Sequence, residues 1–405
     1  MLSEERNRRL TEVGPGKPMG ALLRRYWQPI AAVAELDDAP TKAVRLLGED
    51  LVLYKDLSGR YGLLERHCPH RSADLSYGIV EACGLRCNYH GWMFDAAGAC
   101  REQPFEDIDA PEIRFRDQIR IRAYRVEAKA GLLWAYLGPE PAPLVPNWEP
   151  FTWANGFVQI VFATVPCNWF QCQENSIDPV HFEWMHDNWG ARLNGRNDYA
   201  PRHTKLAFDE FEYGLTYRRV REDSDESSEL WTVGRVCLWP NALFTGNHFE
   251  WRVPIDDTNT LSVGWFFTRV PKDREPYVQN SNPYWHSPIV DEKGGRWITS
   301  HIMNQDFVGW VGQGAITDRK REHLGRSDRG IIMMRQRFFK DLDTVAAGGE
   351  PKAIVRDPEA NRCIELPIIG RQHFVEGTAP PRREFPFLVG QPDAVRRAYD
   401  AAMGF

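Results

Sequence analysis

The alternation of apolar and polar positions predicts a β-rich first third of the chain. Apolar side chains alternate with polar ones over 43–55, and residues 57–59 favour a turn, so 43–67 is expected to form a hairpin. A second pair of strands is expected over 119–137, with its turn at Lys129-Ala130-Gly131. This part of the chain is therefore expected to form a small β domain.

A run of prolines interrupts this pattern. Five prolines stand between residues 139 and 150, and proline is tolerated neither in a helix interior nor in a central strand. We therefore expect a domain boundary near residue 142. It would separate an N-terminal segment and the small β domain, at 1–142, from a second domain at 143–405.

The second domain combines strands with helices. Strands are expected at 157–166, 205–220, 231–239 and 248–270. The last of these ranges is a strand pair that turns at Asp256-Asp257-Thr258-Asn259. A helix is expected to begin at Ser327-Asp328 and to end at Gly348-Gly349, with apolar side chains at helical spacing between them. The expected fold class is α+β.

Composition gives no indication of nucleic acid or of a membrane as a partner. The 405 residues are 42% apolar and 26% charged, with a net charge of −6. No apolar run approaches the ~20 residues of a membrane-spanning helix, and the basic first twenty-five residues have no signal-peptide core. Eight cysteines at this length do not suggest a disulfide framework. A cytoplasmic location is expected.

The densest cluster of chemistry-bearing residues is Cys68-Pro69-His70 followed, sixteen residues later, by Cys87-Asn88-Tyr89-His90. Two thiolates and two imidazoles on two short loops suit a Rieske [2Fe–2S] centre, in which two Cys hold one iron and two His hold the other. Such a centre is a one-electron relay with a potential of about −150 to +300 mV.

A structural zinc site is the alternative, because two Cys and two His also suit Zn²⁺. A zinc finger places its two thiols on one short loop and its two imidazoles on another, whereas each loop here supplies one of each, which favours the iron–sulfur cluster. Respiratory-type Rieske proteins carry an extra cysteine on each loop. Ala73 and Tyr89 stand at the corresponding places, so that disulfide is not expected.

A second metal site is suggested by His181 and His186, which follow the carboxylate of Asp178. Two histidines and a carboxylate form the facial triad of non-haem Fe(II) oxygenases, which leaves positions open for O₂ and substrate. On an ideal α-helix, side chains five residues apart point about 140° away from each other. A π-bulge or a helix break between the two histidines is therefore required.

The two constellations together resemble the oxygenase (alpha) component of Rieske non-haem iron aromatic ring-hydroxylating oxygenases, over nearly the whole chain. Further motifs are similar to the phthalate-dioxygenase-like branch, which includes aromatic-acid dioxygenases and O-demethylases. They are Met19-Gly20, Arg24-Arg25-Tyr26-Trp27 and Asn304-Gln305-Asp306. The resemblance implies a small all-β Rieske domain followed by a catalytic domain, whose curved antiparallel sheet is flanked by helices that carry a mononuclear iron.

The resemblance also implies that Asp306 completes the iron site with His181 and His186. From the residues alone, Asp318 and Asp328 compete with it. Asp318 lies in a basic stretch that suggests an ion pair, and Asp328 sits in the first turn of a helix, where the helix dipole favours a carboxylate. Asp306 opens an apolar run and has no such structural role, so it is preferred.

Asp178 has two interpretations. Followed by Pro179, it has the pattern of a helix N-cap with proline at the first helical position. The resemblance instead implies that Asp178 bridges His181 and the cluster ligand His90 of a neighbouring subunit, which couples the two metals. That role implies a ring-shaped homo-oligomer, either a homotrimer or a homohexamer.

We therefore interpret the chain as the terminal oxygenase of a multicomponent system that uses O₂. It lacks a strand–GxGxxG–helix unit and plant-type ferredoxin cysteine spacing, so electrons are expected from an external NAD(P)H-dependent reductase, with or without a ferredoxin domain. The alternative is a Rieske-type electron-transfer protein without oxygenase activity, which would need no second iron.

The expected substrate is an aromatic acid. Two reactions fit equally well, namely cis-dihydroxylation of the ring and monooxygenation of a methoxy group with O-demethylation. The residues after the iron histidines include several that suit a carboxylate, and they are Arg192, Arg196, Arg202 and His203. Arg202 is preferred because Ala200-Pro201-Arg202 is similar to a segment of phthalate dioxygenase, although a surface role is as plausible for each arginine alone.

Overall fold

The computed structural model describes residues 1–377 and 389–405 and divides them into two compact units. The smaller unit is Arg24–Val145, and the larger unit combines Met1–Leu23 with Pro146–Phe405. The chain thus crosses between units within the proline-rich segment, close to the predicted division at residue 142. The N-terminal segment, which we had grouped with the small β domain, belongs instead to the larger unit.

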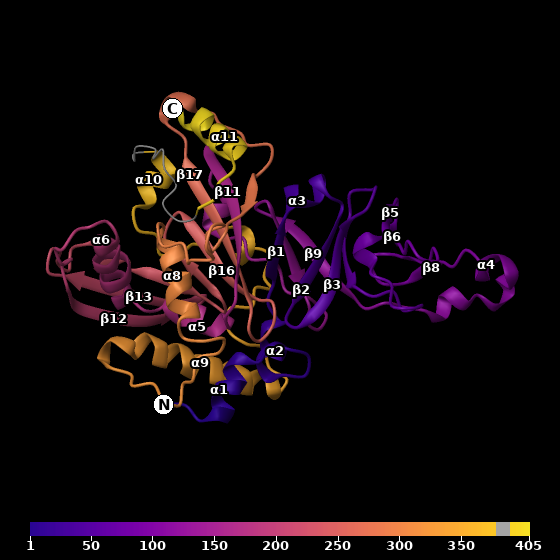
Figure 1. The fold of residues 1–405 in the computed structure, drawn as a ribbon, viewed down its shortest axis with the longest axis horizontal. Coiled ribbons are helices and arrows are strands. Elements are labelled where there is room, and N and C mark those ends of the chain that lie inside the picture. The colour runs from indigo at the N-terminus through magenta and orange to yellow at the C-terminus, as the bar shows by residue number, and fades with distance from the viewer. Residues whose placement is uncertain (378–388) are drawn as a thin grey trace. The chain divides into compact units, whose positions relative to one another are not determined.

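Two contacts explain why the N-terminal segment belongs to the larger unit. Helices α1 (Glu4–Thr11) and α2 (Pro18–Leu23) lie beside the long helix α9 (Arg329–Ala346) (Figure 1). The guanidinium of Arg6 lies 4.2 Å from the ring centroid of Phe339, and Arg9 pairs with Asp343 at 2.7 Å. These partners are more than 300 residues away in sequence, so local patterning could not reveal them.

The smaller unit contains two sheets. The first has six strands in the order β1-β10-β9-β4-β3-β2. Their bounds are Gln28–Ala32 (β1), Leu132–Tyr136 (β10), Ala123–Lys129 (β9), Tyr61–Glu65 (β4), Glu49–Lys55 (β3) and Thr41–Leu46 (β2). The second sheet has the order β5-β6-β7-β8. Its strands are Ile79–Glu81, Gly84–Arg86, Met93–Phe94 and Cys100–Glu102. The predicted strand pair over 119–137 is confirmed as β9 and β10.

The expected single strand over 43–55 is wrong, because the chain turns inside it. Leu47 and Gly48 both have positive φ, 49° and 77°, as a two-residue hairpin turn requires. Leu46 therefore pairs with Glu49, and β2 and β3 form a hairpin of their own. The turn expected at 57–59 is confirmed: the Asp56 carboxylate accepts hydrogen bonds from the backbone N–H groups of Ser58 and Arg60.

The larger unit is built on one sheet with the order β12-β13-β14-β15-β16-β17-β11-β18. The bounds are His203–Phe211 (β12), Gly214–Arg221 (β13), Arg235–Leu238 (β14), Ala242–Phe244 (β15), His248–Pro254 (β16), Thr260–Arg269 (β17), Gly156–Val165 (β11) and Tyr284–His286 (β18). Neighbouring strands are antiparallel except β18, which runs parallel to β11. The sheet confirms the predicted pair over 248–270.

Two expected strands of the larger unit are longer than the strands in the structure. The range 205–220 is a hairpin of β12 and β13 rather than one strand, since Phe211 pairs with Gly214. The start of the range 231–239 belongs to a short helix, α7 (Glu229–Thr232), which Ser228 caps. Apolar alternation continues through both places, so it gave no indication of where the strand ends.

Helices cover the sheet of the larger unit and position the site. Phe307 and Trp310 of α8 (Ile302–Val311) pack with Val161 of β11 and Phe266 of β17 in one buried core. Helix α5 (Trp169–Asn175) contributes Cys172 to the same core. The helix expected to begin at 327–328 is confirmed as α9, which ends at Ala346. The remaining α-helices of the described residues are α3 (Val33–Asp38), α4 (Glu106–Asp109), α6 (Gly190–Leu193), α10 (Arg371–Glu376) and α11 (Asp393–Met403).

A buried charge network joins α5 to the rest of the larger unit. The Glu174 carboxylate accepts hydrogen bonds from Arg319 at 2.5 Å and from Arg335 of α9 at 2.7 Å. Arg319 also donates to the side chain of Asn7 in α1 at 2.9 Å. Burial alone would raise the pKa of Glu174, but the two guanidinium groups outweigh it and hold that pKa below its ordinary value.

No helix in the described ranges combines the length and apolar character needed to span a bilayer.

We predict that Glu174→Gln lowers the free energy of unfolding by about 3 kcal/mol, because it leaves the buried guanidinium of Arg319 without its carboxylate, while Arg335 keeps Glu322. Chemical denaturation at neutral pH measures this loss. The pKa of Glu174 is depressed, so its stabilisation is present above the ordinary value of 4.5 and is lost as the pH falls through the folded value. The difference between the two proteins should therefore shrink in acid. Asp343→Asn, which breaks the exposed pair with Arg9, should change stability little.

Candidate metal centres and substrate cavities

The two histidines predicted to bind iron lie on a widened helical turn. Residues Phe182–Trp189 form a π-helix, η5, directly after His181. A π turn spans five residues instead of four, so His181 and His186 come to the same side, with their ring centroids 5.1 Å apart. The requirement for a π-bulge between the two residues is confirmed.

Asp306 of α8 completes the group. Its Oδ1 atom lies 3.7 Å from Nε2 of His181 and 3.3 Å from Nε2 of His186. One ligand atom from each of these three residues lies within 4.8 Å of the others, which fits a metal ion. The competing carboxylates have local roles: Asp318 accepts a hydrogen bond from the Lys320 backbone, and Asp328 from that of Gly325.

Neighbouring side chains orient two of these three residues, His186 and Asp306. Nδ1 of His186 lies 3.0 Å from Oε1 of Gln305, and Nδ2 of Asn175 donates to Oδ1 of Asp306 at 3.2 Å. Nε2 of His186 is buried and has no hydrogen-bond partner among the described residues, so its lone pair can bind a metal. Burial alone would lower the pKa of His186, but the Asp306 carboxylate outweighs it and raises that pKa. The negative charge of the Asp306 carboxylate favours a divalent cation at this position.

Asp178 makes a capping hydrogen bond and also faces His181. Its Oδ1 atom accepts a hydrogen bond from the backbone N–H of Val180 at 2.8 Å, as an N-cap does. Its Oδ2 atom lies 3.8 Å from Nδ1 of His181. Burial alone would raise the pKa of Asp178, but His181 and the backbone N–H groups outweigh it and lower that pKa. The side chain remains 27% exposed, so the carboxylate is accessible from outside.

The four predicted cluster ligands lie on two similar turns of the smaller unit. Cys68 donates its N–H to the carbonyl of Ala73 at 2.9 Å, and Cys87 donates to that of Trp92 at 2.8 Å. The rings of His70 and His90 lie 4.5 Å apart, centroid to centroid. The fold therefore brings the imidazoles of the two loops together.

The protonation chemistry of these residues suits a [2Fe–2S] cluster. Cys68 and Cys87 are both 2% exposed. Burial and the nearby Cys87 raise the pKa of the Cys68 thiol, so its thiolate needs a metal partner. Burial and the neighbouring His90 lower the pKa of His70, which keeps this imidazole neutral. Its buried Nδ1 atom has no hydrogen-bond partner in the part of the chain that the structure describes. Neutral imidazole is the form in which His binds iron, whereas Cys binds iron as the thiolate and loses its proton on binding the metal.

Comparison with known proteins agrees with both centres. A family model described as the Rieske [2Fe-2S] domain matches residues 26–112. The 5,5'-dehydrodivanillate O-demethylase oxygenase subunit of Sphingobium sp. is 60% identical over 413 residues, which cover 100% of this chain and 97% of that protein. The phthalate 4,5-dioxygenase oxygenase subunit of Pseudomonas putida is 31% identical, over 86% of this chain and 88% of that protein.

A solved structure shows the same fold. The structure of Pseudomonas putida CBB5 NdmA matches with a TM-score of 0.58 at 22% identity, and covers 82% of this chain and 94% of that chain.

The chain belongs to the Rieske non-haem iron oxygenases, in which it is an oxygenase (alpha) component. Its α+β fold, a Rieske domain with a mixed catalytic domain, is that of the family. Its cofactors are a Rieske [2Fe–2S] cluster and a mononuclear iron, and it is a terminal oxygenase. The relatives support the oxygenase interpretation rather than the electron-carrier alternative.

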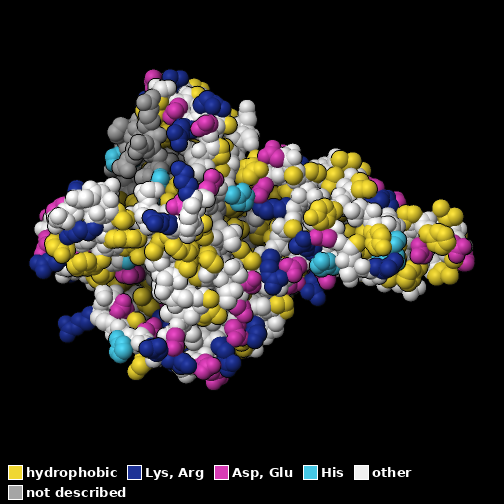
Figure 2. Space-filling view, viewed as in Figure 1, with side chains coloured by type: hydrophobic (Ala, Val, Ile, Leu, Met, Phe, Trp, Pro, Cys, Tyr) yellow, Lys and Arg dark blue, Asp and Glu magenta, His cyan; other side chains and the backbone are white. Residues whose placement is uncertain are grey.

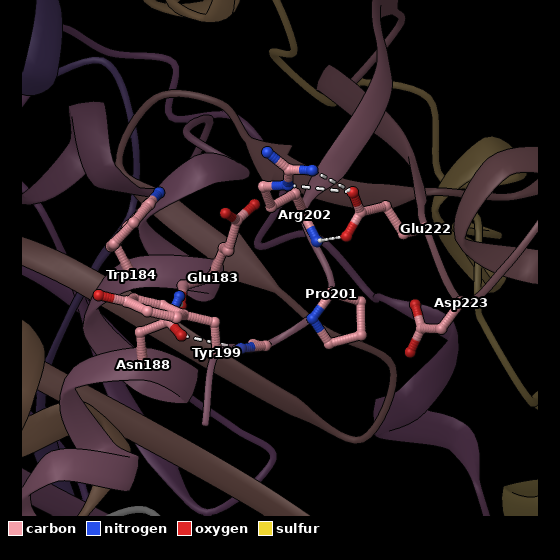
Figure 3. A pocket seen from close by; sticks show the side chains of 9 residues that line it. Glu183, Trp184, Asn188, Tyr199, Pro201, Arg202, Glu222 and Asp223 are labelled. Atoms are coloured by element: carbon pink, nitrogen blue, oxygen red, sulfur yellow. Dashed lines mark hydrogen bonds and ion pairs between the residues drawn. The ribbon is translucent and has the colours of Figure 1, made fainter. Parts of the chain in front are cut away.

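Two cavities lie beside the π-helix. One, of about 410 Å³, has His186 in its wall together with Arg196 and Arg221. The other, of about 630 Å³, is lined by Trp184 and Arg202 among others (Figure 3). The segment Tyr199-Ala200-Pro201 borders both.

Arg202 lies at the surface of the second cavity and already has a partner. Its side chain is 74% exposed, and it donates hydrogen bonds to the Glu222 carboxylate at 2.8 and 3.0 Å (Figure 3). None of the three grouped metal residues lines this cavity. Arg221, which lines the cavity that reaches His186, had not been selected from sequence, because nothing local distinguishes it from the other arginines of β13.

Asn175 and Gln305 are the other residues without a role assigned from sequence. Gln305 lies inside the motif Asn304-Gln305-Asp306, and Asn175 stands three residues before Asp178. Amide side chains directly beside ligand residues were the available indication that these positions orient the ligands.

We predict that His181→Ala removes the mononuclear iron and abolishes turnover but leaves the visible absorption of the cluster intact, because the two ligand sets lie in separate units. Iron and acid-labile sulfide, close to a 3:2 ratio in loaded wild-type protein, should approach 2:2. Cys87→Ala should instead bleach the cluster. Loss of the cluster absorption in His181→Ala would contradict the assignment.

Proposed function

We propose that this oxygenase removes a methyl group from a methoxylated aromatic acid. The observation that carries the proposal is the 60% identity, over the full chain, to a protein named as a 5,5'-dehydrodivanillate O-demethylase subunit, against 31% to a ring dioxygenase. The reaction is Ar–O–CH₃ + O₂ + 2e⁻ + 2H⁺ → Ar–OH + CH₂O + H₂O. Oxygen is inserted into a methyl C–H bond, and the product loses formaldehyde.

His181, His186 and Asp306 are proposed to hold the mononuclear iron. When bound, the iron supplies the activation of O₂ in its open positions. Asn175 and Gln305 keep the Asp306 carboxylate and the His186 ring in place, so that the ligand atoms are already convergent before substrate arrives. The buried surroundings of α5 and α8 limit access of water to these atoms.

Cys68, Cys87, His70 and His90 are proposed to hold the Rieske cluster, with the thiolates on one iron and the imidazoles on the other. The neutral state of His70 and the burial of both cysteines support this assignment. The external donor is proposed to be an NAD(P)H-dependent reductase, because the chain has no dinucleotide-binding motif of its own.

Electrons are proposed to pass between subunits of a ring-shaped homotrimer or homohexamer, with Asp178 between His181 and His90 of the next chain. The exposed fraction of Asp178 and its oxygen facing His181 support this role. Hydrophobic side chains also gather at the surface around α4 (Figure 2). Four of them, with exposed fractions from 38% to 83%, are Phe105, Ile108, Ile113 and Phe115. Exposed apolar patches of this kind mark protein–protein contacts.

Arg202 is proposed to contribute to binding the substrate carboxylate at the cavity beside Trp184. A bidentate guanidinium suits a carboxylate, and the position borders the segment shared with the cavity that reaches His186. Substrate would have to exchange with Glu222, which neutralises Arg202 in the free protein. Arg202 is therefore expected to affect KM rather than kcat.

The reaction is tested by supplying the purified oxygenase, with a reductase, with paired substrates that carry methoxy or no methoxy groups on the same aromatic acid. We expect one formaldehyde per O₂ consumed from the methoxylated acids, including the biaryl 5,5'-dehydrodivanillate. A cis-dihydrodiol without formaldehyde would establish ring dihydroxylation instead and overturn the demethylase proposal.

The bridging role of Asp178 is tested with Asp178→Asn, which keeps the shape of the side chain but removes its charge. We expect the variant to fold, hold both metals and accept electrons at the cluster, but to pass them to the iron far more slowly. Stopped-flow oxidation of the pre-reduced cluster by O₂, with substrate bound, reports that step.

A capping role alone predicts another result for Asp178→Asn. Loss of an N-cap costs roughly 0.5–2 kcal/mol of stability and leaves electron transfer unchanged. Ser228→Ala, which removes the cap of α7, is the matched capping control and should show only that stability loss. Wild-type oxidation rates in a fully metallated Asp178→Asn protein would leave Asp178 with the capping role only.

A further inference from the structure

Glu183 occupies an unusual position in the π-helix. Glu183 lies between the two iron histidines in sequence and is 4% exposed. No lysine or arginine of the described ranges pairs with it; its partner is His203, at the start of β12. Oε2 of Glu183 accepts hydrogen bonds from the backbone N–H of His203 at 2.7 Å and from Nδ1 of its ring at 2.8 Å. A buried carboxylate is tolerated only with such partners.

The hydrogen bonds of His203 define its tautomer. Because Nδ1–H donates to Glu183, Nε2 carries the lone pair, and Nη1 of Arg219 lies 3.3 Å from it as a donor. Burial lowers the pKa of His203, and Arg219 and Arg221 add to this effect, against the opposing contribution of Glu183. The ring is therefore a neutral link between a buried anion and a buried cation.

Arg219 also contacts a residue that lies beside both iron histidines. The guanidinium carbon of Arg219 lies 4.7 Å from the ring centroid of Phe182, which is also covered by Arg235 at 4.5 Å. The Phe182 ring in turn lies 4.6 Å from the ring of His181 and 5.1 Å from that of His186. Arg219 and His203 thus contact the π-helix at two successive residues, Phe182 and Glu183.

We propose that Glu183, His203 and Arg219 form a positioning row that holds the wide turn of η5 and so keeps both iron histidines directed at one metal. π turns are rare and less favourable than α turns. If the turn relaxed to α-helical geometry, the two imidazoles would point about 140° apart. The hydrogen bonds from β12 to Glu183 fix the backbone of the widened turn between the two ligands. The proposal rests on the assignment of His181 and His186 as iron ligands.

The test replaces His203 and measures the iron directly. The amide nitrogen of asparagine takes the place of imidazole Nδ1, so His203→Asn keeps the side-chain hydrogen bond to Glu183, whereas His203→Gln reaches only toward Arg219 and His203→Ala keeps neither side-chain contact. The backbone N–H of residue 203 still donates to Glu183 in all three variants, so the comparison isolates the side-chain bond. Lys205→Ala is the matched control, since it removes an exposed ion pair with Glu226 from the same strand.

Two readouts are taken on the holoenzyme without substrate. One is the rate at which a chelator removes the mononuclear iron, and the other is the EPR spectrum of its nitric oxide adduct with the cluster oxidised, whose rhombicity reports ligand geometry. We expect His203→Ala and His203→Gln to release iron roughly 10- to 100-fold faster, as is typical for loss of partners that orient ligands, and to alter the spectrum. His203→Asn and Lys205→Ala should resemble the wild type.

Wild-type iron release and an unchanged spectrum in His203→Ala would overturn the proposal, even if that variant were less stable. Equal loss of iron from His203→Asn and His203→Gln would also overturn it, because the hydrogen bond to Glu183 would then not decide the geometry. If His203→Ala does not fold, the Asn and Gln pair still decides. Neither readout involves substrate, so an error in the proposed substrate class leaves this test intact, whereas retention of iron by His181→Ala would locate the failure in the ligand assignment itself.

Discussion

The wide turn of η5 is the constraint on which the catalytic unit depends. An α-helix cannot direct side chains five residues apart at one metal, and the π-helix Phe182–Trp189 can. The turn has to be held from both sides. On one side α5 and α8 supply Asn175, Gln305 and Asp306, which converge on the ligand atoms. On the other side the hairpin of β12 and β13 reaches Glu183 and Phe182 through buried hydrogen bonds and cation–π contacts. The sheet is thus as necessary to the iron site as the helix that carries the histidines.

Buried charges in the larger unit are placed where they tie distant segments to this site. Glu174 precedes Asn175 in α5, and its carboxylate is shared by Arg319 and Arg335. Arg319 also donates a hydrogen bond to the side-chain oxygen of Asn7. A chain of paired charges therefore runs from the N-terminal helix to the residue beside the one that orients Asp306. Each charge is expensive to bury alone and tolerable as part of the network, which explains why the N-terminal segment packs with the larger unit.

The two metal centres use the same principle with different means. In the smaller unit, two short turns each present one Cys and one His. Burial lowers the pKa of His70, which keeps its imidazole neutral, and raises the pKa of the Cys68 thiol. In the larger unit, a carboxylate raises the affinity of its surroundings for positive charge, as the raised pKa of His186 shows. A cluster with two thiolate and two neutral imidazole ligands suits an electron relay, and an open iron site with one carboxylate ligand suits an oxygen-activating centre.

The sequence by itself determined the features that are local. The Cys and His of each cluster loop lie within a few residues of each other. The five-residue spacing of His181 and His186 required a π turn, and the prolines indicated where the chain passes from one unit to the other. Only the tertiary structure decided the rest. The sequence favoured Asp306 over the other carboxylates, but only the structure shows it beside His181. The hydrogen bond between His203 and Glu183 and the ion pair between Arg202 and Glu222 had no signal in the sequence. The turns at Leu47-Gly48 and between β12 and β13 were missed because apolar alternation continues across them. Spacing along the chain fixes which residues share a turn, whereas the partners of a buried charge depend on how separate strands and helices pack.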